Sequence, residues 1–110
     1  NLGCFFNDYW PEASLLHGDL WGGNWASSNG QPVIFDPAVY YGDRESDIAM
    51  TKLFGGFGDA FYEAYEEAWP MTAGSNKRIL LYQLYHVLNH LNIFGSSYLG
   101  RAQDLIRRLL

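Results

Sequence analysis

The sequence predicts an α+β fold in which a small β-hairpin is followed by four helices. A turn signal, Asn29–Gly30, separates two short apolar segments, which is typical of a hairpin. The rest of the chain alternates helical apolar periodicity with breaks that contain glycine or proline. No repeat or low-complexity tract interrupts the 110 residues, so one domain with one modest core is expected.

The amino-terminal part of the chain is expected to carry the strands. Residues 1–14 are expected to be irregular, because breakers such as Trp10–Pro11 interrupt them. Leu15–Leu16 predicts a short strand that leads into a loop. Asn24–Ser27 predicts the first strand of the hairpin, and the β-branched and aromatic segment Val33–Phe35 predicts its return strand.

The helices are expected at about 44–54, 59–69, 77–94 and 97–110. Gly55, Gly56 and Gly58 separate the first two, and Pro70 follows the second. The third has the widest apolar stripe, which predicts a position at the centre of a helical bundle. Ser96 or Ser97 is expected to cap the last helix.

Composition narrows the classes of function. The formal net charge is -5, which argues against a nucleic-acid or anionic-membrane surface. No run of eighteen apolar residues is present, so no membrane span is expected. The single cysteine, Cys4, has no internal partner for a disulfide, which fits a cytoplasmic location.

Three residues are arranged as phosphoryl transfer requires. Such a reaction needs a carboxylate that orients the attacking hydroxyl and oxygen ligands that hold Mg²⁺ on the phosphates. Asp19 and Asn24 have the D-x-x-x-x-N spacing of a kinase catalytic loop, with His17 two residues before the aspartate. Asp36 follows a short apolar strand, as the second metal ligand of kinases does. A hairpin between Asn24 and Asp36 would bring both to the same end of its strands.

Two segments also resemble a known family. His17–Asn24 (HGDLWGGN) and Val33–Met50 (VIFDPAVYYGDRESDIAM) are similar to the fructosamine/ketosamine-3-kinases. That family belongs to the aminoglycoside phosphotransferase and choline kinase group, which has a protein-kinase-like fold. The resemblance extends from about Phe5 to the carboxyl terminus. It implies a mostly helical C-terminal lobe whose hairpin carries a catalytic loop, 17–24, and a metal-binding loop, 36–47.

The resemblance assigns expected roles to the residues of these loops. It implies that Asp19 is the catalytic base and that Asn24 and Asp36 are the Mg²⁺ ligands. His17 resembles the histidine that supports the geometry of the catalytic loop.

Four further residues have expected roles that the resemblance suggests or the sequence leaves open. Asp47 resembles an aspartate that hydrogen-bonds back to the catalytic loop, and helix N-capping is a compatible alternative. Trp21 is expected either to pack on the apolar face of a sugar or to lie in the core. Arg44 and Glu45 are expected either to pair with each other or to line the acceptor site.

His86 and His90 stand four residues apart on the expected third helix, a spacing that occurs in zinc sites. Val87 occupies the place of the glutamate in an H-E-x-x-H motif, and no cysteine lies near in the sequence. The sequence therefore favours two histidines on a packed or partly exposed helix face.

A complete kinase-like enzyme also has a nucleotide lobe, with a glycine-rich loop and a lysine on a strand. The sequence shows no such loop, and no lysine precedes Lys52. We expect the nucleotide lobe to be absent, the chain to be roughly the last third of an enzyme, and the isolated chain to be inactive. Phe5, Phe6 and Trp10 would then leave apolar surface exposed, or an oligomer or the missing lobe would cover it.

The expected function is ATP-dependent phosphorylation of a hydroxyl on a glycated amine, with Mg²⁺ as the metal. One alternative is a related kinase that acts on an aminoglycoside, choline or homoserine. Another is a non-catalytic fragment that serves only as a binding or assembly module.

Overall fold

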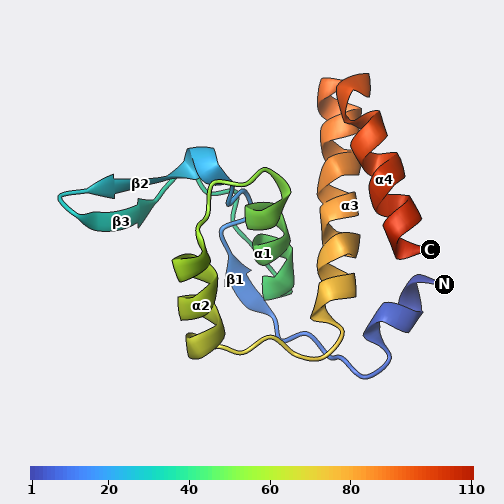
Figure 1. The fold of residues 1–110 in the computed structure, drawn as a ribbon, viewed down its shortest axis with the longest axis horizontal. Coiled ribbons are helices and arrows are strands. Elements are labelled where there is room, and N and C mark those ends of the chain that lie inside the picture. Colours follow the sequence, from blue (N-terminus) through green and yellow to red (C-terminus); the bar gives the residue numbers. More distant parts are fainter.

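Four α-helices and two separate antiparallel sheets form the fold of residues 1–110 in a computed structural model (Figure 1). The helices are α1 (Arg44–Leu53), α2 (Asp59–Ala68), α3 (Ser75–Phe94) and α4 (Leu99–Leu109). The strands are β1 (Ser14–Leu16), β2 (Trp25–Ser28), β3 (Gln31–Ile34) and β4 (Tyr40–Gly42). Short 3-10 turns cover Leu2–Phe6, Gly22–Asn24 and Ser96–Tyr98. The expected mixture of helices with a small antiparallel hairpin is confirmed.

Strands β2 and β3 form a hairpin that extends away from the helices (Figure 1). Asn29 and Gly30 both have positive φ angles, 52° and 76°, as a type I′ turn requires. Trp25 pairs with Ile34 at the open end, and the Phe35 amide donates to the Asn24 carbonyl at 3.0 Å. Every residue of both strands is exposed, so the hairpin is an arm whose open end adjoins the loops.

Of the two strands of the second sheet, the sequence predicted only the first. Strand β1 pairs antiparallel with β4, and Leu16 lies opposite Tyr40. Strand β4 is three residues long and its partner lies far back in the chain, so no local pattern marks it. The 3-10 turn at Leu2–Phe6 also lies in a segment expected to be irregular, where the Asn1 side chain accepts from the Gly3 amide at 3.0 Å.

Helix α3 packs between α1 and α4 and carries most of the core contacts (Figure 1). Leu53 of α1, Val87 of α3 and Leu105 of α4 belong to one buried cluster. A second cluster joins α1 to α3 through side chains that include Ile48 and Ile79. The central place expected for the third helix therefore agrees with its contacts.

Helix α4 begins differently from the expectation. Residues Ser96–Tyr98 form a 3-10 turn, and the α-helix starts only at Leu99. Neither Ser96 nor Ser97 caps it, because no side chain hydrogen-bonds to its first amides. Gly95, with φ at 97°, is the only residue between α3 and the 3-10 turn, and it caps the end of one and the start of the other.

A buried ion pair joins α1 to α3. Glu45 is 1% exposed and Arg78 is 2% exposed. Arg78 donates from Nε and Nη2 to the Glu45 carboxylate at 2.8 and 2.9 Å. The guanidinium also lies over the Tyr9 ring, 3.7 Å from its centroid. Because both charges are removed from water, each depends on the other for its stability in the interior.

Asp43 connects this pair to two phenols. It is the N-cap of α1, where its carboxylate accepts from the Glu45 amide at 3.0 Å. Tyr9 and Tyr82 donate their hydroxyl protons to the same carboxylate at 2.9 and 2.7 Å. Burial, followed by the hydrogen bond to Asp43, raises the pKa of both tyrosines well above the usual value. Both phenols therefore act as donors that hold the start of α1 in place.

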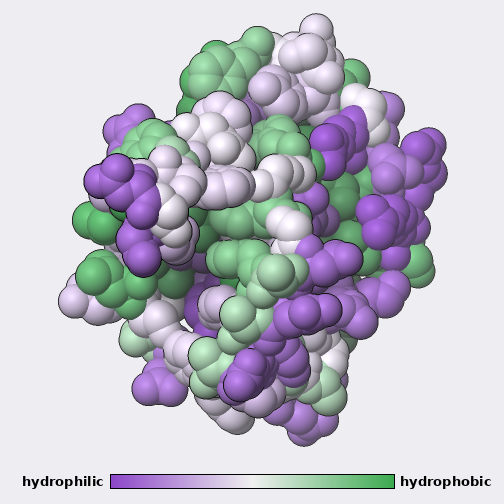
Figure 2. All heavy atoms as spheres, turned by 60° about the vertical axis from the view of Figure 1, so that its left-hand side comes forward, coloured by the Kyte–Doolittle hydropathy of each residue, from purple (hydrophilic) through white to green (hydrophobic).

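Large apolar side chains remain at the surface. Trp10, Tyr41 and Phe94 are 91%, 73% and 66% exposed. Figure 2 shows apolar and hydrophilic side chains interleaved on the side that carries the hairpin and α2. None of the helices combines the length and the apolar character needed to cross a membrane. Coverage of the exposed residues by a second copy or by a further lobe stays a prediction.

Candidate active site

The loop after β1 is held by the side chain of Asp47 in α1. Asp47 accepts from the His17 amide through Oδ2 at 2.8 Å and from the Gly18 amide through Oδ1 at 3.0 Å. It lies in the first turn of α1, whereas the N-cap is Asp43. The capping role considered for Asp47 is therefore wrong, because the cap position is already filled. The carboxylate connects the helix to the start of the loop instead.

The imidazole of His17 connects the loop that carries Asp19 to the segment that precedes Asp36. Its Nδ1 accepts from the Asp19 amide at 3.2 Å, so its Nε2 carries the proton and donates to the Phe35 carbonyl at 2.8 Å. Phe35 directly precedes Asp36. His17 thus fixes the backbone on which Asp19 stands relative to the backbone that carries Asp36.

Gly18 allows this loop to pack tightly. Its φ is +85°, a left-handed conformation that favours glycine. A Cβ at this position would lie 1.9 Å from the Ala38 carbonyl oxygen. The Ala38 amide in turn donates to the His17 carbonyl at 2.8 Å. The loop and the segment before β4 are therefore in backbone contact that only glycine permits.

Asn24 closes the loop at its other end. Its side chain is 6% exposed, and Nδ2 donates to the Asp19 carbonyl at 2.9 Å and to Asp19 Oδ2 at 3.2 Å. The amide oxygen of Asn24 accepts no hydrogen bond, yet no buried side-chain oxygen is left without a partner. That oxygen consequently reaches solvent, where a cation or a water molecule can meet it.

Asp36 lies at the same end of the hairpin as Asn24. The pairing of Phe35 with Asn24 closes the hairpin one residue before Asp36. Asp36 has a φ of 53°, which is uncommon for a residue other than glycine and is often found at functional positions. Its carboxylate is exposed and makes no ion pair.

The donor set at this end fits Mg²⁺ in its chemistry. A carboxylate and an amide oxygen are ligands that this ion accepts, and phosphates and water commonly supply the remaining oxygens. No group of three or more His, Cys, Asp or Glu side chains is placed to hold a metal ion. Any ion bound here would depend on Asn24 and Asp36 together with oxygens from outside the chain.

Asp19 opens into a cavity of about 720 Å³. Trp21, two residues further along the loop, lines the same cavity and is 40% exposed. The opposite wall comes from the segment after α1, from α3 and from the 3-10 turn before α4. The full lining is Asp19, Trp21, Gly22, Phe54, Gly55, Gly56, Asn89, His90, Ile93, Phe94 and Tyr98. This volume lies in the range of sites that bind small molecules. The mostly aromatic wall beside one carboxylate suits a polar molecule with an apolar face.

Residue His90 is part of this wall, which sequence reasoning missed. Its Nδ1–H donates to the His86 carbonyl at 2.8 Å, which leaves Nε2 as an acceptor. Its ring lies 5.3 Å from the rings of Phe54 and Tyr98. Only the tertiary packing of α3 brings it to Asp19, since the two are distant in sequence. The i, i+4 spacing to His86 predicted that both histidines lie on one face of a helix, but it did not show that this face would meet the loop of Asp19.

The side chain of His86 is buried between α3 and α1 and is hydrogen-bonded to the backbone. It is 6% exposed, and its Nε2–H donates to the Ser46 carbonyl at 3.1 Å. Burial lowers the pKa of His86, and the hydrogen bond to the Ser46 carbonyl opposes this shift only in part. The neutral imidazole is therefore the form that the folded protein favours.

Arg44 and Glu45 do not pair with each other. Arg44 is 7% exposed and donates to the carbonyls of Trp69 and Pro70 at 2.8 and 2.7 Å. Its guanidinium also lies over the Trp69 ring, 4.0 Å from the centroid. Glu45 is buried against Arg78. Neither lines the cavity at Asp19, so both side chains support the helices in this structure.

Comparison with known proteins shows the family to which the whole chain is similar. A model of the fructosamine kinase family matches residues 1–110. The chain belongs to the fructosamine kinase family. A provisionally named ketoamine kinase from Vibrio parahaemolyticus is 55% identical over 100 residues, which are 91% of this chain and 35% of that protein. The ketosamine-3-kinase of Mus musculus is 50% identical over 104 residues, or 94% of this chain and 34% of that protein.

A solved structure of this family has the same arrangement. The crystal structure of a provisionally named fructosamine-3-kinase from Haemophilus somnus superposes with a TM-score of 0.86 at 37% identity. The match covers 99% of this chain and 38% of that chain. The chain thus spans about a third of the length of the curated relatives that it matches.

Proposed function

We propose that this chain is the catalytic-loop portion of a ketoamine kinase, which transfers the γ-phosphoryl group of ATP to a hydroxyl of a sugar-derived amine. The observation that carries the proposal is the position of Asp19 in the wall of the 720 Å³ cavity, with Trp21 on the same loop. Membership of the fructosamine kinase family supports the reaction class. The helical arrangement around the loop is proposed to be the C-terminal lobe of a protein-kinase-like fold.

In this proposal, Asp19 orients the acceptor hydroxyl. Asn24 donates to one carboxylate oxygen, Oδ2, at 3.2 Å. The other oxygen, Oδ1, is left to accept the proton of the attacking hydroxyl, which is the role of the aspartate in kinase catalytic loops. Since His17 and Asp47 hold the loop backbone from both sides, the carboxylate keeps its direction while a substrate enters.

The phosphate side of the reaction is assigned to Asn24 and Asp36. These residues would hold Mg²⁺, which supplies neutralisation of the charge on the ATP phosphates. Both residues flank the open end of the hairpin, and Asn24 contacts Asp19 through Nδ2, so the hydroxyl and the phosphates would meet at this end. The nucleotide itself would need further protein groups to cover its phosphates.

The acceptor is proposed to enter the aromatic cavity. The indole of Trp21 offers a face on which the apolar side of a sugar ring can pack. His90 Nε2 offers an acceptor for a sugar hydroxyl or for the amine. A glycated amine has both an apolar ring face and polar groups, so it matches this mixture of walls.

The proposal is tested by replacing Asp19 in the complete gene product. We expect Asp19→Ala to lower kcat with a glycated amine by about a hundredfold or more, because general base or orienting groups contribute at this scale. Glu12→Gln, which changes an exposed carboxylate away from the cavity, should leave kcat within about twofold. Near-normal turnover of a folded Asp19→Ala variant would remove Asp19 from the mechanism.

The acceptor class is tested separately with a panel of substrates. Glycated amines should be phosphorylated in preference to aminoglycosides, choline and homoserine at equal concentration. A preference for any of the latter three would place the chain with a different small-molecule kinase while leaving the role of Asp19 intact. Absence of phosphorylation with every acceptor, in a preparation that binds Mg²⁺-ATP, would favour a non-catalytic binding module.

A further inference from the structure

The positive charge of this acidic chain is distributed unevenly. The chain has seven Lys and Arg residues against a net charge of -5. Arg44 and Arg78 are buried and fully engaged with internal partners. The remaining five are exposed and lie on α4, at the start of α3 and at the end of α1: Lys52, Lys77, Arg101, Arg107 and Arg108. Every exposed Lys or Arg side chain is therefore on these three helices.

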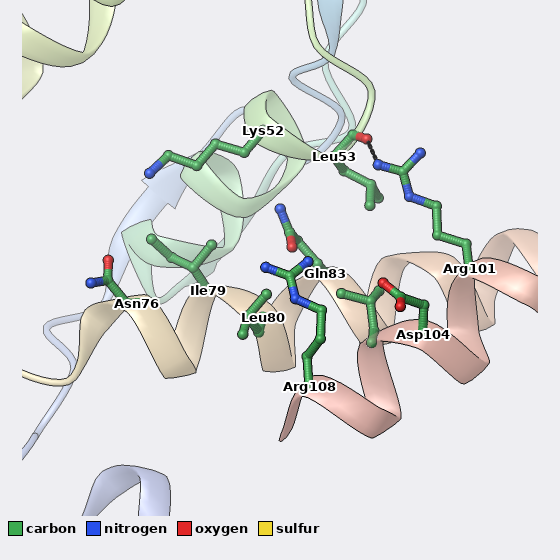
Figure 3. A pocket seen from close by; sticks show the side chains of 10 residues that line it. Lys52, Leu53, Asn76, Ile79, Leu80, Gln83, Arg101, Asp104 and Arg108 are labelled. Carbon is green, nitrogen blue, oxygen red and sulfur yellow. Dashed lines mark hydrogen bonds between the residues drawn. The ribbon is translucent and has the colours of Figure 1, made fainter. Parts of the chain in front are cut away.

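Three of these cations line one cavity. It has a volume of about 590 Å³ and lies between α1, α3 and α4. Figure 3 shows Arg101 extending from α4 to the end of α1 at Leu53 and Arg108 extending toward the Gln83 amide, with Lys52 at the far edge, its ammonium directed away from both arginines. Arg101 and Arg108 are seven residues apart, which is two helical turns, so both face the same side of α4. Asp104 is the one acidic residue among the lining residues.

The cations of this cavity retain most of their hydrogen-bond donors. The guanidinium of Arg108 makes no hydrogen bond or ion pair with the chain. Arg101 donates to the Leu53 carbonyl through a single nitrogen. The Lys52 ammonium makes no ion pair and lies 5.1 Å from the centroid of the Tyr62 ring. Each guanidinium carries five donors in a planar fork, so a large donor capacity faces the cavity unused.

The single carboxylate does not neutralise this charge. Asp104 Oδ1 lies 3.6 Å from Arg107 Nη2, a residue that does not line the cavity. Its charge is thus shared with a cation outside. Like charges in one cavity repel each other, and a bound anion would relieve that repulsion.

This cavity is distinct from the one at Asp19. The two share no lining residue, although Leu53 lines one and its neighbour Phe54 lines the other. The cavity at Asp19 is lined by aromatic side chains, whereas this one presents cations and the amides of Asn76 and Gln83. The chemistry of the two sites therefore differs, and the acceptor site does not account for the basic one.

We propose that the cavity between α1, α3 and α4 is a second binding site, which takes the phosphate group of a small molecule through Arg101 and Arg108. Planar guanidinium groups bind phosphate oxygens through paired hydrogen bonds. Lys52 lies at the edge of the cavity with its ammonium over the Tyr62 ring, and the Gln83 amide nitrogen donates one hydrogen to the Ala49 carbonyl at 3.4 Å, which leaves its second hydrogen free. The proposal does not depend on the reaction proposed for Asp19.

The chain contains a matched pair of variants for the test. Arg107 and Arg108 are neighbours on α4 and are both exposed, but only Arg108 lines the cavity. Pyrophosphate and glucose 6-phosphate are titrated into the complete gene product by isothermal calorimetry without nucleotide, because the phosphates of a nucleotide would compete for the proposed site. We expect saturable binding with a Kd of about 1 mM. Arg108→Gln should weaken this binding about tenfold and Arg107→Gln less than twofold.

The proposal is overturned if no saturable binding appears up to about 10 mM of either probe. It is also overturned if the two variants weaken binding equally, because the effect would then come from the general charge of α4. Vesicles that contain phosphatidylinositol 4,5-bisphosphate form a further arm. Arg108-dependent binding to vesicles without binding of the soluble probes would assign the surface to a lipid headgroup and contradict the small-molecule site.

Discussion

At the scale of single residues, the site is positioned by side chains that form hydrogen bonds with the backbone of the loops. Asp47 accepts from two successive amides of the loop, and His17 connects the amide of Asp19 to the carbonyl before Asp36. These two residues therefore determine where Asp19 and Asp36 stand. Small errors of position are costly in a reaction that depends on alignment, so residues that touch no substrate are expected to affect the rate.

Replacement of His17 tests this positioning role. We expect His17→Ala to lower kcat by about tenfold to a hundredfold, since both loops lose a fixed contact. The Mg²⁺ concentration for half-maximal activity should rise in the same variant, because the backbone before Asp36 is released. A loss of stability alone would lower the active fraction without changing the Mg²⁺ dependence, so the metal titration separates the two explanations.

Gly23 keeps the indole of Trp21 in place. A Cβ at position 23 would lie 2.2 to 2.5 Å from three carbons of that ring. We expect Gly23→Ala to displace the indole and to raise KM for the glycated amine about tenfold, with kcat changed less. Gly58→Ala is the matched control, because an added Cβ there meets no atom within 4 Å. An unchanged KM in Gly23→Ala would show that the indole does not contact the acceptor.

At the scale of elements, local chemistry predicted the helices and the hairpin better than the second sheet. Glycine and proline mark where α1, α2 and α3 stop, and the Asn29–Gly30 turn determines the register of β2 and β3. Strand β4 has no comparable signal, because its three residues are defined only by pairing with β1. The α4 start was misplaced for a similar reason, as the preceding 3-10 turn has no marker in the sequence.

In the site, too, local spacing in the sequence predicts the position of some residues, whereas helix packing determines the position of others. The sequence predicted that a hairpin between Asn24 and Asp36 would bring these two residues to the same end of its strands, and the pairing of β2 with β3 does so. The far wall of the cavity, with His90, depends on how α3 packs against the loop. Arg44 and Glu45 were expected either to pair with each other or to line the acceptor site, yet their partners, Trp69 and Arg78, lie on other parts of the chain.

The pair of Glu45 and Arg78 joins α1 to α3, and its loss should loosen that contact. We expect Glu45→Gln to lower the free energy of unfolding by about 3 kcal/mol, because Arg78 stays buried without its countercharge. Asp104→Asn removes a partner of the exposed pair with Arg107 and should change the value by less than about 0.5 kcal/mol. Urea denaturation of both variants gives the comparison, and equal effects would contradict the importance of burial.

At the scale of the whole molecule, stability should depend on pH through His86. Its folded-state pKa is lowered by burial, whereas in the unfolded chain it has the ordinary value of 6.5. The unfolded state therefore binds the proton more readily, and this contribution to stability is complete above about pH 6.5 and is lost as the pH falls below that value. Acid exposure should destabilise the fold before the carboxylates titrate.

The measurement is the free energy of unfolding at pH 7.5 and at pH 5.5. We expect a lower value at pH 5.5 for the protein with His86 and a smaller difference for His86→Gln, which keeps a donor for the Ser46 carbonyl. An identical pH dependence in both proteins would assign the effect to other groups.

The hairpin of β2 and β3 has a practical consequence for protein engineering. Its tip, at Asn29 and Gly30, is at the opposite end of the strands from Asn24 and Asp36, and an added Cβ at Gly30 meets nothing within 4 Å. An epitope tag or a fluorophore attachment sequence inserted between the two turn residues would extend into solvent, and the strand pairs nearer the open end would keep their register. The arm thus offers a reporter position that is joined directly to Asn24 and Asp36 and does not line either cavity.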